Sequence, residues 1–129
     1  MSKGPQFTFA FNLKTTNEER TDMFDLYQKA FNAKKLSEST PPNSDEIHIM
    51  MEIYGLKVLI GPGNAVGKGL DNEIICEIRF DNEDEFYYAY NILIQDSQKH
   101  SLEGPYPWAN LLGLVTDKFG VGRALYYNE

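Results

Sequence analysis

The stretch FTFAFNLKTTNEERTDMFDLYQKAFN, residues 7–32, changes its hydrophobic pattern partway along. Over residues 7–13 every second residue is apolar, which predicts a β-strand with one apolar face. The apolar residues then recur at helical spacing, and Thr16 or Asn17 provides a residue type that caps helix N-termini. Asn32 suits the left-handed conformation that often ends a helix. The stretch therefore predicts a strand followed by an amphipathic helix.

Further strands follow this helix, and the whole pattern then recurs. A strand is expected directly after Asn32, and residues 46–53 and 56–60 predict two more strands joined by a hairpin at Tyr54-Gly55. The second copy begins after the glycine-rich connector GPGNAVGKGLDN. It comprises a strand at 73–80, a helix carrying residues 86–94, and strand material around Leu102, at 111–116 and at 121–127, with a turn at Asp117–Gly120.

This order predicts an α+β fold of two paired βαβββ modules that form a curved mixed sheet with a cleft. We expect one domain over residues 1–129, with the first module at about 5–62, a linker at about 63–71 and the second module at about 72–129. Each module has a single helix, which can cover only one face of its sheet. The opposite face must therefore be buried by the other module or by a partner, or line a cavity.

Composition excludes several classes of partner. The formal charge is −7 and no basic stripe is visible, so nucleic acid is not expected as a partner. The N-terminus has no apolar signal region and no run reaches eighteen apolar residues, so no membrane association is expected. We expect a cytoplasmic protein.

Three segments carry a resemblance to a known family. DLYQKAFNAKKL, IHIMMEIYGLKVLIGPG and WANLLGLVTDKFGV occur in this order. Together they resemble the PhnB-like branch of the glyoxalase/bleomycin-resistance/extradiol-dioxygenase superfamily, whose fold is called vicinal oxygen chelate. The resemblance implies a homodimer with a cleft for a small-molecule ligand. In metal-dependent members of this superfamily, His, Gln or Glu side chains hold a divalent metal.

The chain offers an incomplete set of such ligands. The cavity-facing positions of the first strand are Thr8, Ala10, Asn12 and Lys14, which include neither histidine nor carboxylate. We therefore expect no metal or other cofactor, with a divalent metal as the alternative, and we assign no catalytic residue. The residues expected to line the cleft are Asn12, His48, Met50, Glu77, Arg79, Trp108 and Arg123.

Four of these candidates also have a structural alternative. His48 suits a ligand contact or a proton-transfer group, or else a structurally bonded histidine. Glu77 and Arg79 suit ligand binding, or else an ion pair within the sheet. Trp108 suits a cavity wall, or else the core. Arg123 stands near the position where the PhnB-like branch carries tryptophan, so a cation replaces an aromatic wall.

The expected function is metal-free binding of an apolar or aromatic small molecule. The first alternative is a metal-dependent enzyme of glyoxalase or dioxygenase type, in which His48 and Glu77 contribute to the metal site. The second alternative is a structural or regulatory dimer without a ligand. The fold alone does not decide among these functions.

Overall fold

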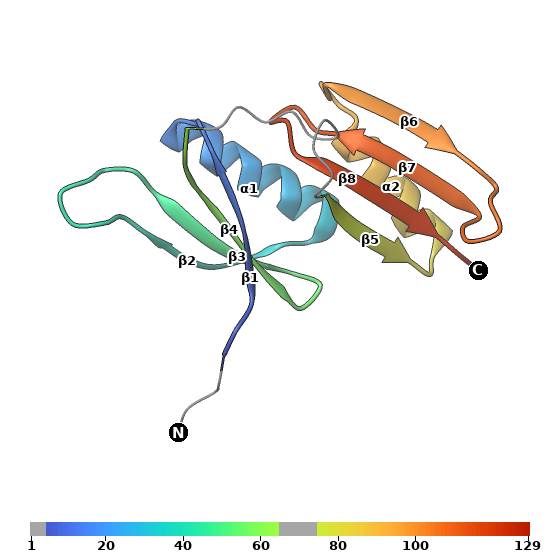
Figure 1. Ribbon diagram of the computed structural model, residues 1–129, viewed down its shortest axis with the longest axis horizontal. Coiled ribbons are helices and arrows are strands. Elements are labelled where there is room, and N and C mark those ends of the chain that lie inside the picture. The colour runs from blue at the N-terminus through green and yellow to red at the C-terminus, as the bar shows by residue number, and fades with distance from the viewer. Residues whose placement is uncertain (1–4, 65–74) are drawn as a thin grey trace. The chain divides into compact units, whose positions relative to one another are not determined.

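The structure is a computed structural model that describes residues 5–64 and 75–129 (Figure 1). The chain divides into two compact units, Met1–Ala65 and Val66–Glu129. The predicted linker at 63–71 lies largely outside the described residues, as does the start of the strand predicted at 73–80. The two units are described in turn.

The first unit contains a four-stranded mixed sheet and one helix. In the sheet order β1-β4-β3-β2, β1 runs parallel to β4 and the other neighbours are antiparallel. The elements are β1 (Thr8–Leu13), α1 (Asn17–Phe31), β2 (Lys34–Ser39), β3 (His48–Ile53) and β4 (Leu56–Pro62).

Helix α1 begins and ends at the residues that the sequence indicates. Thr16 is the N-cap of a complete capping box with Glu19, because each side chain accepts a hydrogen bond from the other residue's backbone N–H. At the other end Asn32 adopts the left-handed conformation, with φ 55°. The predicted bounds of this helix are confirmed.

One face of the first sheet forms the core of the unit. Helix α1 packs on β3 and β4. Met23 and Tyr27 from the helix are fully buried, as are Ile49, Met51 and Ile60 from the sheet. The alternate residues of β3 point to the opposite face, which this helix does not cover.

The second unit repeats the arrangement. Its sheet order is β5-β8-β7-β6, with β5 parallel to β8 and the other neighbours antiparallel. The elements are β5 (Cys76–Phe80), α2 (Glu83–Leu93), β6 (Lys99–Glu103), β7 (Leu111–Thr116) and β8 (Gly122–Tyr127). The α+β class and the two strand–helix–strand–strand–strand repeats are thus confirmed.

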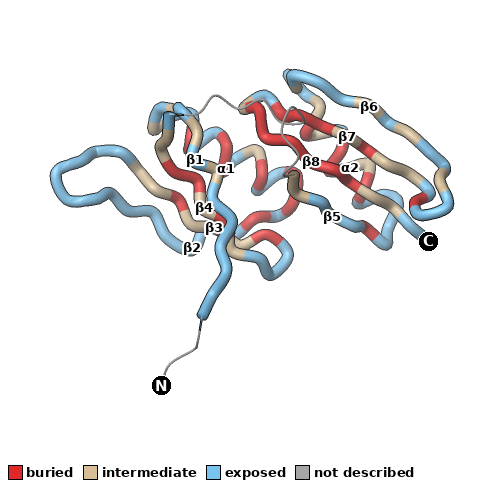
Figure 2. The backbone as a smooth tube through the Cα atoms, in the orientation of Figure 1, coloured by how far each residue is buried: buried red, intermediate tan, exposed pale blue. Residues whose placement is uncertain are grey.

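Helix α2 covers one face of the second sheet. A Cβ atom on Gly113 of β7 would lie 2.8 Å from Tyr90 Cδ2 and 3.3 Å from Phe86 Cζ, so the helix approaches the sheet at this glycine. The edge strands β2 and β6 are the most exposed strands of their sheets (Figure 2). No helix within the described residues is long and apolar enough to span a membrane.

The turn between β7 and β8 is organised by one buried carboxylate. Asp117 accepts hydrogen bonds from the backbone N–H groups of Phe119 and Val121. Its other oxygen lies 2.7 Å from Arg123 Nη1, in an ion pair whose side chains are at most 2% exposed. Such a pair is costly to break, because removing one partner leaves a buried charge uncompensated.

Gly120 closes this turn with φ 87° and donates a backbone hydrogen bond to the Asp117 carbonyl. Gly120→Ala should lower the free energy of unfolding by about 1 kcal/mol or more, because a Cβ atom strains this backbone conformation. Urea denaturation followed by circular dichroism measures the change. Gly120→Asn should lose less stability, since asparagine tolerates positive φ. Equal stability of the alanine variant and the native chain would contradict this account of the turn.

Candidate functional site

The helix-free face of the first sheet brings three sequence-predicted residues together. Asn12 and His48 come from different strands and meet over Gly61 of β4. A Cβ atom on Gly61 would lie 2.6 Å from Asn12 Oδ1 and 3.3 Å from His48 Cδ2. Met50 follows on the same face of β3, where its neighbour across the strand pair is Leu59. This face therefore places an amide and an imidazole beside an apolar strip.

The imidazole of His48 has a defined direction for hydrogen bonding. Its Nδ1 atom lies 3.3 Å from the carbonyl oxygen of Glu46, which can only accept a hydrogen bond. In the neutral ring Nδ1 is then the donor, and Nε2 is an acceptor. A ligand that donates a hydroxyl hydrogen matches this nitrogen.

The chain leading into His48 is tied to the start of helix α1. Asn17 donates to the Asp45 carbonyl at 2.8 Å and accepts from the Ile47 backbone N–H at 2.9 Å. Arg20, which is 1% exposed, in turn donates to the Asn17 side chain and to the Thr15 carbonyl. These bonds fix the residues on both sides of Glu46, and so support the carbonyl that orients His48.

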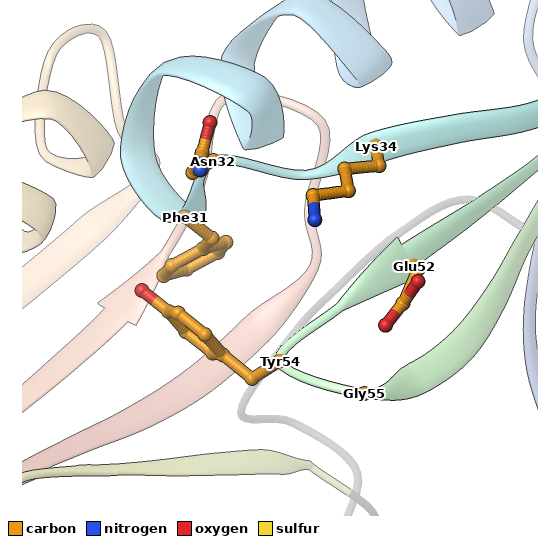
Figure 3. Close-up of a pocket in the computed structure, with 6 residues that line it drawn as sticks. All are labelled: Phe31, Asn32, Lys34, Glu52, Tyr54 and Gly55. Atoms are coloured by element: carbon orange, nitrogen blue, oxygen red, sulfur yellow. The ribbon is translucent and has the colours of Figure 1, made fainter.

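A pocket of about 250 Å³ opens at the end of this unit, where β3 turns into β4 (Figure 3). The Phe31 and Tyr54 rings lie beside one another there, with centroids 6.1 Å apart. Lys34 and Glu52 are register partners on neighbouring strands and give the pocket both charges. The full lining is Phe31, Asn32, Lys34, Glu52, Tyr54 and Gly55. The pocket includes none of the predicted cleft residues, and its volume is below the roughly 300 Å³ at which sites for drug-sized ligands begin.

The donors of the first unit do not fit a catalytic metal. His48 and Glu52 share a face of β3 but are four residues apart, which places their Cα atoms about 13 Å from one another. Asn12 contributes only a neutral amide, a poor ligand for first-row metals. In the residues that the structure describes, no group of three or more His, Cys, Asp and Glu side chains is positioned to hold a metal ion.

The helix-free face of the second sheet presents a row that crosses all four strands. Strand register aligns Arg79 with Tyr126, Tyr126 with Leu112, and Leu112 with Glu103. The row therefore runs from a cation through an aromatic and an aliphatic side chain to a carboxylate.

Glu77 and Arg79 interact with each other and with Tyr126. The Arg79 guanidinium lies 4.5 Å from the centroid of the Tyr126 ring and 3.9 Å from the Glu77 carboxylate. The pKa of Tyr126 is raised, first because its hydroxyl hydrogen-bonds to Glu77 and then because of burial. Both charged side chains are exposed, so their ion pair contributes little stability and the groups remain accessible to a ligand.

Arg123 differs from its predicted position. It is register partner to Cys76 and Val115 on the face that α2 covers, and it is 2% exposed in its pair with Asp117. The expectation that it lines a cleft is therefore wrong. Its charge supports the β7–β8 turn because the Asp117 carboxylate is buried beside it.

Trp108 is neither core nor part of a strand. It is 59% exposed in the β6–β7 connection and stacks on Tyr106, with ring centroids 4.9 Å apart and an interplanar angle of 5°. Tyr106 donates to Glu103, which also accepts from Ser101. These two bonds, that of Tyr106 first, lower the pKa of the Glu103 carboxyl. Glu103 and Tyr106 are not among the residues predicted from the sequence, where the short spacing in EGPYPW is the only signal for them.

Comparison with known proteins gives structural matches only. No family model matches the chain. No curated protein matches it either. Among solved structures, protein PA1353 from Pseudomonas aeruginosa has a TM-score of 0.73 at 18% identity, covering 97% of this chain and 98% of that one.

Two further solved structures are similar to the chain over almost all of its length. The PhnB protein from Bacillus cereus has a TM-score of 0.69 at 15% identity and covers 98% of this chain and 100% of its own. A mutant of the fosfomycin resistance protein FosX from Listeria monocytogenes, in complex with Mn(II) and 1S,2S-dihydroxypropylphosphonic acid, has a TM-score of 0.70 at 16% identity. The match covers 100% of this chain and 95% of that one.

These likenesses establish the fold. The chain has the glyoxalase/bleomycin-resistance fold, as the PhnB protein and FosX do. At these identities the matches carry no ligand, metal or reaction over to this chain.

Proposed function

We propose that the protein binds a small organic molecule on the helix-free face of its first sheet, without a catalytic metal. The observation that carries this proposal is the approach of Asn12 and His48 over Gly61. These two polar side chains come from different strands and converge over a glycine, which has no side chain to separate them. Convergent polar groups beside apolar side chains are typical of ligand sites.

The side chains on this face favour a hydroxylated aromatic or acyl acid. His48 Nε2 accepts a hydroxyl hydrogen, and Asn12 both donates and accepts. Met50 and Leu59 provide an apolar surface for a ring or a short acyl chain. Lys57 is the register partner of Glu52 at the far end of the same face; its ammonium group donates to Gln6 Oε1 at 2.7 Å and has further hydrogens for a ligand carboxylate. We use para-hydroxybenzoate as the reference probe.

Metal content and ligand stabilisation test this function together. The protein purified without chelator should contain no stoichiometric metal, and calorimetric titration with Zn²⁺, Ni²⁺ and Mn²⁺ should show no site that depends on His48. Para-hydroxybenzoate should raise the melting temperature, since a ligand of the native state stabilises it by mass action. His48→Ala should weaken the binding by about three- to tenfold, as expected for one lost neutral hydrogen bond.

Stoichiometric metal that is lost in His48→Ala would instead favour the enzyme alternative. Absence of any metal, together with failure of all hydroxylated aromatic and acyl acids to stabilise the protein, would favour the structural or regulatory dimer. Glu38→Gln is the matched control for ligand binding, because Glu38 pairs with Lys35 in β2 and neither residue belongs to the proposed site.

We also propose that the chain forms a homodimer. Phe7, which precedes β1, and Phe9 within it are 71% and 37% exposed and pack edge to face, with centroids 5.2 Å apart. Leu36 on the edge strand β2 is 47% exposed. Burying apolar surface is favourable by about 25 cal/mol per Å², so association through these side chains would be stabilising.

Light scattering should therefore report about twice the mass of one chain at micromolar concentration. The double substitution Phe7→Ser with Phe9→Ser should shift the protein toward the monomer, because it removes the exposed ring pair. Tyr88→Ser is the matched control, since Tyr88 is a 62% exposed aromatic residue on α2. A native chain that is monomeric while fully folded would contradict the proposed dimer.

A further inference from the structure

The stacked rings of Tyr106 and Trp108 form a braced aromatic platform in the β6–β7 connection. Backbone hydrogen bonds join Tyr106 and Ala109 in both directions, at 2.8 and 3.2 Å. The Trp108 carbonyl also accepts from the Asn128 side chain at 3.0 Å. The parallel stack and these bonds hold an exposed indole in place. Such ordering before binding lowers the entropy cost of holding a ligand.

A carboxylate is built into this platform. Glu103 Oε1 lies 2.8 Å from the Tyr106 hydroxyl, and Oε2 lies 2.9 Å from the Ser101 hydroxyl. Both hydroxyls donate, so the carboxylate keeps its negative charge beside the rings. Donation by the Tyr106 hydroxyl also increases the electron density of its ring, which stacks on Trp108.

We infer that the Glu103–Tyr106–Trp108 cluster binds the alkylated ammonium group of a small molecule. Indole is the aromatic ring that attracts cations best, through the negative face of its π-system. The chain places cations over aromatic rings elsewhere, with Lys35 over Phe24 and Arg79 over Tyr126. In the described part of the chain, no lysine or arginine lies over the Tyr106 or Trp108 ring.

Charge and area narrow the class of ligand. The formal charge of −7 and the Glu103 carboxylate attract cations and repel phosphates, so a nucleotide base stacked on Trp108 is disfavoured. One stacked ring pair offers contact area for a single head group. Stable protein interfaces bury about 1,200 Å² or more, so we assign the platform to a free small molecule. This site lies on residues separate from His48 and Asn12, and each site can fail its test independently.

Trp108 fluorescence tests the inference directly, because Trp108 is the single tryptophan of the chain. Choline, at ionic strength balanced with sodium chloride, should change the emission saturably. Its neutral isostere, in which carbon replaces the ammonium nitrogen, should bind about tenfold more weakly, as expected for loss of the cation–π and carboxylate attraction.

Glu103→Gln should reduce choline affinity several-fold and leave the isostere unaffected. Tyr106→Leu should also reduce choline affinity, and this variant keeps Trp108, whose fluorescence reports binding. Asp96→Asn is the matched control for loss of one negative charge, since Asp96 is exposed, lies in the same unit and has a positive φ that asparagine accepts. Its choline affinity should equal that of the native chain.

Three results would overturn the binding of an alkylated ammonium group. The first is equal binding of choline and its isostere, and the second is an unchanged choline affinity in folded Glu103→Gln. The third is no saturable response of Trp108 to choline. A trimethyl-lysine peptide that binds more than about tenfold tighter than choline would overturn the assignment to a free small molecule and indicate a protein partner.

Discussion

A single helix can cover only one face of a four-stranded sheet, and the remaining structure depends on this constraint. In the first unit the covered face supplies the core around Tyr27, Met51 and Ile60, while alternation along the strands sends Asn12, His48 and Met50 to the other side. In the second unit the same alternation separates the buried Arg123 from Glu77 and Arg79. The groups available for chemistry are those that the helices leave uncovered.

The fold was predictable because its decisive signals are local. The capping box of Thr16 and the left-handed Asn32 fix the ends of α1 through hydrogen bonds between residues close in sequence. The positive φ of Gly120 follows in the same way from a four-residue turn. Strand alternation is equally local, so it correctly placed Asn12, His48 and Met50 on one face.

The remainder of the site depends on contacts that no local pattern encodes. All residues from Gly122 to Leu125 are buried, so β8 shows no polar alternation from which the face of Arg123 can be read. Its pairing with Asp117 follows from register and burial. The support that Arg20 and Asn17 give to the segment before His48 spans about thirty residues of sequence. The Glu103–Tyr106 bond joins residues only three apart, but no common turn or capping motif in EGPYPW indicates it.

The central claim is that the face carrying Asn12 and His48 is a binding surface, and mapping amide chemical shifts during titration with para-hydroxybenzoate tests it most directly. Perturbations should be concentrated in β1, β3 and β4, and benzoate should produce weaker ones because it lacks the hydroxyl group that donates to His48 Nε2. Gly61→Ala should reduce them without unfolding the chain, since the new Cβ would lie 2.6 Å from Asn12 Oδ1, an atom that side-chain rotation can move away. Perturbations confined to other elements, or equal responses to the two acids, would contradict the account.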